Sequence, residues 1–164
     1  MKKPLKSMMG IASPTGSHLP VLESQVGKLT SDALVIEHGA GLYSTPLLAR
    51  LGCRVLCAEP HPGWREWAEW IYQRRAEFVD SYKRIIERVG EASLVFVDGP
   101  ARERGPILQA CFDHGVPAVI AHDTQQGEWG HYGYQPHMFK QPDYAVSQHA
   151  EDSHRTTLWV RRSS

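Results

Sequence analysis

Short apolar runs alternate with helix-like segments along most of this chain. The runs before residue 124 have the length of single strands, and the first of them is rich in branched residues. They occupy residues 33–37, 54–59, 77–80, 93–99 and 117–123. Strands that alternate with helices form a parallel sheet covered on both faces, because right-handed crossovers return each helix to the sheet. The sequence therefore predicts a doubly wound α/β fold.

The last two apolar runs have no helix between them. Residues 143–148 and 156–162 are separated by a polar turn, which predicts an antiparallel hairpin. Together the runs predict a mostly parallel seven-stranded sheet that ends in this hairpin. We expect a single domain over residues 31–164, preceded by an N-terminal segment and covering helix over residues 1–30.

Residues 124–142 combine glycines, histidines and aromatic residues without periodicity, and they predict a long loop. Such a loop suits a substrate lid, or equally a surface excursion packed on its own aromatic side chains. His131 and His137 lack the spacing of a closed zinc site.

The composition argues against several partner classes. The 164 residues suit one domain, and 18 basic residues balance 18 acidic ones, so we expect neither nucleic acid nor a membrane as a partner. No apolar run has the length of a membrane span or signal peptide. Three cysteines without a CxxC pair predict reduced, buried thiols in a cytoplasmic protein. The sequence leaves open whether the chain forms a homo-oligomer.

The first expected strand ends in a glycine turn, Gly39-Ala40-Gly41, followed by a helix that starts near Ser44 or Thr45 as its cap. Backbone in such a turn can approach a ligand closely, and the helix directs free N–H groups to the same place. The G-x-G-x-x-G motif of a dinucleotide-binding fold has a third glycine at the position that Ser44 occupies here. S-adenosylmethionine, which carries an ammonium group, is favoured by the nearby Glu37. A tight turn that binds nothing is the third alternative.

Acidic residues end every expected parallel strand. The carboxyl ends of parallel strands meet at one edge of a sheet, where ligands bind in doubly wound folds. The acids at this edge are Glu37, Glu59, Asp80, Asp98 and Asp123.

Several of these segments resemble the class I S-adenosylmethionine-dependent methyltransferases. "EHGAGLYST" is similar to their first motif, "VLCAEPHPGW" to their second strand, and "EFVDS" to the segment that flanks adenine. "LVFVDGPARERGPI" and "AVIAHDT" resemble the fourth and fifth strands of a small branch of that family. The resemblance covers roughly residues 30 to 162 and implies a Rossmann-like methyltransferase fold with S-adenosylmethionine as cofactor.

The resemblance also implies roles for individual residues. Glu37, Gly39 and Gly41 would contact the methionine part of the cofactor, and Glu59 would bind ribose. Asp80 and Ser81 would border adenine, and Asp98 would face the methyl-transfer site. The full expected cofactor set is Glu37, Gly39, Ala40, Gly41, Ser44, Thr45, Glu59, Pro60, His61, Asp80, Ser81 and Asp98.

Asp98, His122 and Asp123 are the expected catalytic residues, with His122 as the base because its pKa lies near neutrality. A buried histidine and a turn-capping aspartate are the alternative. A divalent metal could also bind this trio, but a third acidic or amide ligand is not evident, so we expect no metal. His18 is a candidate contact, and Arg104, like Arg102, would hold an anionic acceptor or stay solvated.

We therefore expect a methyltransferase that acts on a small-molecule or carbohydrate-like acceptor at oxygen. One alternative is a non-catalytic relative that binds the cofactor or serves as an assembly subunit. The other is an NAD-binding oxidoreductase, which the missing third glycine disfavours.

Overall fold

The computed structural model describes residues 18–73, 75–151 and 154–163. Residues 1–17 of the expected N-terminal segment lie outside these ranges. The helices and strands are α2 (Leu19–Val26), β1 (Leu34–His38), α3 (Ser44–Leu51), β2 (Arg54–Ala58), α4 (Pro62–Tyr72), β3 (Ala76–Val79), α5 (Tyr82–Arg88), β4 (Leu94–Val97), α6 (Ala101–Asp113), β5 (Ala118–Ala121), α7 (Trp129–Tyr132), β6 (Tyr144–Glu151) and β7 (His154–Arg161). Short 3-10 helices occupy Val89–Glu91, Gln126–Glu128 and Pro136–Lys140.

The strands form one seven-stranded sheet in the order β3-β2-β1-β4-β5-β7-β6. The strands β1 to β5 are parallel to one another, whereas β7 runs antiparallel to both β5 and β6. The predicted α/β class, the seven strands and the antiparallel C-terminal hairpin are confirmed. The insertion of β7 between β5 and β6 distinguishes this sheet from a plain dinucleotide-binding order of 3-2-1-4-5-6.

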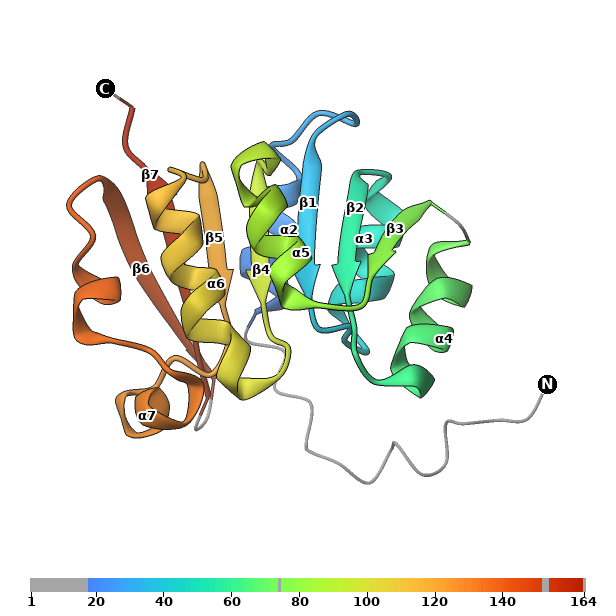
Figure 1. The fold of residues 1–164 in the computed structure, drawn as a ribbon. Coiled ribbons are helices and arrows are strands. Elements are labelled where there is room, and N and C mark those ends of the chain that lie inside the picture. Colours follow the sequence, from blue (N-terminus) through green and yellow to red (C-terminus); the bar gives the residue numbers. More distant parts are fainter. Residues whose placement is uncertain (1–17, 74, 152–153, 164) are drawn as a thin grey trace.

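Helices cover both faces of the sheet (Figure 1), with α5 and α6 in front of it and α2 and α3 behind it. Alternate residues of a strand point to opposite faces. In β1, Val35 joins the apolar cluster under α2, α3 and α4, and Ile36 joins the cluster under α5 and α6. Both faces of the central strands are therefore buried, as expected for a parallel sheet.

Some element boundaries differ from the prediction. The expected strand over residues 143–148 extends to Glu151 as β6. The sequence from 105 to 115 predicts a helix that ends at Gly115, whereas α6 begins four residues earlier, at Ala101, with Pro106 inside it. The expected capping role of Ser44 or Thr45 is wrong, because α3 begins at Ser44 and its N-cap residue, Tyr43, makes no side-chain cap hydrogen bond. The hydroxyl of Thr45 instead bonds Glu37.

Residues 124–142 form a compact unit rather than one extended loop. They contain α7 and two of the short 3-10 helices. The rings of Trp129 and Phe139 stack at 4.3 Å, and the indole N–H of Trp129 donates to the carbonyl of Thr124. Gly105 allows residues 124–142 to pack closely against α6, since a Cβ at this position would overlap the backbone of Gly133. The alternative of a segment packed on its own aromatic residues describes this region well.

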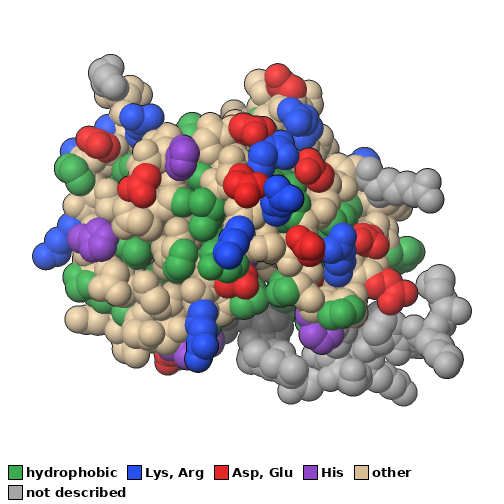
Figure 2. Space-filling model, viewed as in Figure 1, with side chains coloured by type: hydrophobic (Ala, Val, Ile, Leu, Met, Phe, Trp, Pro, Cys, Tyr) green, Lys and Arg blue, Asp and Glu red, His purple; other side chains and the backbone are tan. Residues whose placement is uncertain are grey.

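All three cysteines are free and buried, as predicted. No helix in the described part of the chain is long and apolar enough to cross a membrane. On the face drawn in Figure 2, basic and acidic side chains lie next to one another. Arg84 pairs with Glu87 at 2.9 Å and Arg88 with Glu91 at 2.6 Å.

Candidate active site

The glycine turn after β1 passes directly against the end of β4. Gly39 has a φ of 87°, and a Cβ at this position would overlap the backbone of Gly99. Gly99 in turn donates its N–H to the ring of His38, at 3.3 Å. Only a residue without a side chain fits this conformation and this contact. The turn and the residue after Asp98 are thereby held together.

Glu59 links this turn to the end of β2. Its Oε2 accepts a 2.9 Å hydrogen bond from the N–H of Ala40, and its Oε1 accepts one of 2.7 Å from His61. The side chain is almost fully buried. Each carboxylate oxygen has two acceptor sites, so a fixed Glu59 retains capacity for hydroxyl donors from a ligand.

Glu37 is completely buried and reaches the turn through another residue. Its carboxyl group accepts hydrogen bonds from Thr45 at 2.9 Å and Tyr72 at 2.8 Å, and the thiol of Cys57 lies 3.5 Å away. Thr45 Oγ1 accepts the N–H of Gly41 at 3.0 Å. Burial raises the pKa of Glu37 to about 7, although these donors oppose the rise. Direct contact of Glu37 with a cofactor stays a prediction.

The other expected cofactor residues lie farther along the same edge. His61 accepts a hydrogen bond from Trp64 as the N-cap of α4, and Ser81 accepts one from Lys83 as the N-cap of α5. Pro60 and Asp80 are exposed, whereas Ser44 is buried at the start of α3. Asp80 follows β3, which is separated from β1 by β2.

Asp98, His122 and Asp123 meet where β4 and β5 end. The Nδ1 atom of His122 lies 3.3 Å from Asp98 Oδ1 and 3.5 Å from Asp123 Oδ1. Its Nε2 atom is buried and has no hydrogen-bond partner among the residues that the structure describes. The three residues of the predicted catalytic trio therefore lie together in space, with both carboxylates near the Nδ1 atom of His122.

Arg104 connects the two carboxylates. It lies 3.1 Å from Asp98 Oδ1 and 3.3 Å from Asp123 Oδ2, and it is 6% exposed. It also donates to the carbonyl oxygens of Gly99 and His122. The expected solvated state of Arg104 is wrong, because the early start of α6 directs this side chain back to the ends of the strands. Arg102 is exposed.

Burial and the neighbouring charges shift the pKa values of His122, Asp123 and His18. Burial disfavours the imidazolium of His122, but the hydrogen bond to Asp98 and the charges of Asp98 and Asp123 outweigh it, so the pKa of His122 is raised. Burial of Asp123 is likewise outweighed, by the charge of His122 and the contact to His154, so the pKa of Asp123 is lowered. Burial of His18, whose ring contacts His122 at 4.9 Å, lowers its pKa to about 4.

Two residues at this site were missed by the sequence interpretation. His154 Nδ1 lies 2.7 Å from Asp123 Oδ1, and the hydroxyl of Tyr132 donates to Asp123 Oδ2 at 3.2 Å. The guanidinium of Arg104 lies 4.2 Å from the ring centre of Tyr132. His154 is 31 positions from Asp123, and no local pattern relates the two. Recognising that β7 pairs with β5 would have been needed to find it.

No protein-family profile and no curated protein sequence matches this chain. Solved structures do match it. An rRNA methylase from Streptococcus thermophilus superposes with a TM-score of 0.66 at 12% identity, over 93% of this chain and 100% of that one. A precorrin 8W decarboxylase from Methanobacterium thermoautotrophicum superposes with a TM-score of 0.67 at 12% identity, over 99% of this chain and 96% of that one. An RNA methyltransferase from Salinibacter ruber, in complex with S-adenosyl-L-homocysteine, superposes with a TM-score of 0.54 at 17% identity. The match covers 94% of this chain and 95% of that one.

The sheet order and these similarities define the class of fold. The chain has the Rossmann-like fold of class I S-adenosylmethionine-dependent methyltransferases, and the resemblance seen in the sequence is confirmed at this level. At these identities the similarity concerns the fold, and the substrates of the neighbours belong to those proteins.

Proposed function

We propose that this chain is an S-adenosylmethionine-dependent methyltransferase that methylates a small-molecule or carbohydrate-like acceptor at oxygen. One relationship carries the proposal: the glycine turn bonds Glu59 on one side and touches Gly99, next to Asp98, on the other. Three neighbouring strands, β2, β1 and β4, thus deliver these groups to one edge. The fold neighbours, one of them with S-adenosyl-L-homocysteine bound, support this choice of cofactor.

The cofactor would lie along this edge. In this proposal, the turn Gly39-Ala40-Gly41 receives the methionine part, and Glu59 accepts the ribose hydroxyls. Glu37 acts on the turn through Thr45, whose Oγ1 donates to Glu37 and accepts the N–H of Gly41. Asp80 and Ser81 border the adenine farther along the edge.

The acceptor would lie beside Asp98, His122 and Asp123. A hydroxyl must lose its proton as it attacks the sulfonium methyl group, and this trio offers a histidine held by carboxylates for that purpose. In-line alignment with the methyl group supplies much of the acceleration in such reactions. The balance of 18 basic and 18 acidic residues favours a small acceptor over a polyanionic one.

Calorimetry with S-adenosylmethionine and NAD tests the cofactor. We expect binding of S-adenosylmethionine and none of NAD. Glu59→Ala should weaken it by about 1.5 to 3 kcal/mol, the range for hydrogen bonds to a charged group. Glu66→Ala, an exposed carboxyl group on α4, is the matched control and should leave affinity unchanged. Binding of NAD alone would overturn the proposal.

Transfer itself is tested with isotope-labelled S-adenosylmethionine and a panel of sugars, uronic acids and phenols. Labelled methyl ethers are expected with the wild type and not with His122→Ala, provided that the variant still binds the cofactor. Binding of S-adenosylmethionine without transfer to any member of the panel would favour the non-catalytic alternative.

A further inference from the structure

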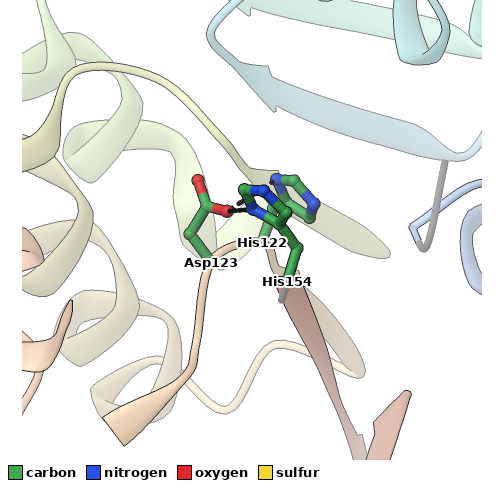
Figure 3. A group of neighbouring side chains, drawn as sticks. All are labelled: His122, Asp123 and His154. Atoms are coloured by element: carbon green, nitrogen blue, oxygen red, sulfur yellow. Dashed lines mark hydrogen bonds and ion pairs between the residues drawn. The ribbon is translucent and has the colours of Figure 1, made fainter. Parts of the chain in front are cut away.

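Two histidines and one aspartate converge where β5 ends and β7 begins (Figure 3). His122 and Asp123 follow β5, and His154 opens β7 beside it. The ligand atoms of the three side chains lie within 4.8 Å of one another. Both Nδ1 atoms approach the same oxygen, Asp123 Oδ1, at 3.5 Å from His122 and 2.7 Å from His154.

We propose that His122, Asp123 and His154 bind one divalent transition-metal ion. Two imidazole nitrogens and one carboxylate oxygen suit Zn²⁺, Fe²⁺ or Co²⁺, whereas Mg²⁺ and Ca²⁺ prefer sites made of oxygen alone. A third ligand is not evident from the sequence pattern. The pairing of β7 with β5 supplies it in His154.

The surroundings hold Asp123 in the orientation that an ion needs. Its Oδ2 is occupied by Arg104 at 3.3 Å and by the hydroxyl of Tyr132 at 3.2 Å, so Oδ1 is the atom that faces the imidazoles. Such partners behind a ligand fix its orientation and strengthen metal binding. The backbone also contributes, because Asp123 has a φ of 54° and Thr124 bonds the carbonyl of Arg155 on β7.

The charge and the freedom of the cluster fit a cation. Metal binding requires neutral imidazoles, and in that state Asp98 and Asp123 outweigh Arg104 by one negative charge. His154 is the most exposed of the three ligands, at 36%. Its ring can therefore turn to widen the 2.7 Å contact to the roughly 3.0 to 3.4 Å that separates two ligands about 2.1 Å from one ion in octahedral or tetrahedral geometry.

The site would define how the acceptor binds, and this step rests on the proposed function. An ion held here would lie near Asp98, because Asp98 Oδ1 is 3.3 Å from His122 Nδ1, and it would bind an acceptor oxygen there. A coordinated hydroxyl is more acidic than a free one. His122 would then serve as a ligand and not as the base, and the coordinated hydroxyl would release its proton to water as it attacks the methyl group. This favours acceptors with a hydroxyl and a neighbouring oxygen that can chelate.

The test is metal binding to the full chain after chelator treatment. Calorimetry and the visible absorption of Co²⁺ should show one ion per chain, and Mg²⁺ should not compete. His154→Ala is expected to weaken Co²⁺ binding by more than roughly tenfold. His137→Ala, an exposed histidine bonded to Gln109, is the control and should bind as the wild type does.

Several outcomes overturn the site. Unchanged Co²⁺ affinity in a folded His154→Ala variant would do so, as would an equal loss in His137→Ala, which indicates adventitious surface binding. A competition by Mg²⁺ at equal concentration would also contradict the ligand chemistry. Calorimetry with S-adenosylmethionine on the same samples separates the two proposals, because cofactor binding does not need the ion and metal binding does not need the cofactor.

Discussion

The hydroxyl of Tyr72 in α4 donates a 2.8 Å hydrogen bond to the buried carboxyl group of Glu37 in β1. This bond joins the helix to the central strand on the face that α3 also covers. Thr45 in α3 donates to the same carboxyl group. Glu37 therefore acts as an internal polar link between two helices and the strand that carries the glycine turn.

Stability should fall as pH rises from about 4.5 to about 7. Burial raises the pKa of Glu37 from 4.5 to about 7, so the folded state keeps a proton that the unfolded state releases. The free energy of unfolding then decreases with pH across this window, by about 3 kcal/mol at most, and this contribution is constant above it. Urea denaturation at pH 5 and pH 8 measures the change. Glu37→Gln, which cannot ionise, should reduce this dependence, and an unaltered dependence in that variant would refute the assignment.

Tyr72→Phe should destabilise the fold by about 1 to 2 kcal/mol, because it removes a donor from a buried carboxyl group. The loss should be larger at pH 8 than at pH 5, since the charged form of Glu37 depends more on its donors. Tyr43→Phe, at an exposed tyrosine, is the control and should change little. Equal losses at both pH values would show that the hydroxyl does not serve the carboxylate.

Arg104→Gln should cost about 3 to 5 kcal/mol, because two mostly buried carboxylates lose their shared guanidinium. Arg50→Gln removes an exposed pair with Glu23 and should cost less than about 1 kcal/mol. Thermal and urea unfolding of both variants give the comparison. Similar small losses in the two would mean that Arg104 is not the link between Asp98 and Asp123.

Gly39→Ala should lower the free energy of unfolding by more than about 2 kcal/mol, since it combines a positive φ with an overlap onto Gly99. Gly127→Ala is the matched control, because a Cβ there would have no atom of the described residues within 4 Å. Its expected change is within about 0.5 kcal/mol. Chemical denaturation of the two variants measures the difference. A tolerated Gly39→Ala would contradict the close contact between Gly39 and Gly99.

Some of the site could be predicted from local pattern because of a general property of parallel sheets. All their strands end at one edge, so the apolar runs that stop at Glu59, Asp98 and Asp123 were enough to place these acids together. The direction of Glu37 could not be predicted in this way. All five residues of β1 are buried, the polar Glu37 and His38 included, so no alternation of apolar and polar residues shows which face each side chain takes.

The sequence by itself determined the kinds of elements, their order and the glycine turn, since periodicity, strand length and glycine content are local properties. The tertiary structure alone decided that β7 lies between β5 and β6, and that α6 begins early enough to bring Arg104 back to Asp98. The position of β7 depends on pairing between segments far apart in the chain. That pairing places His154 against Asp123 and turns a pair of strand-end residues into a three-residue ligand set.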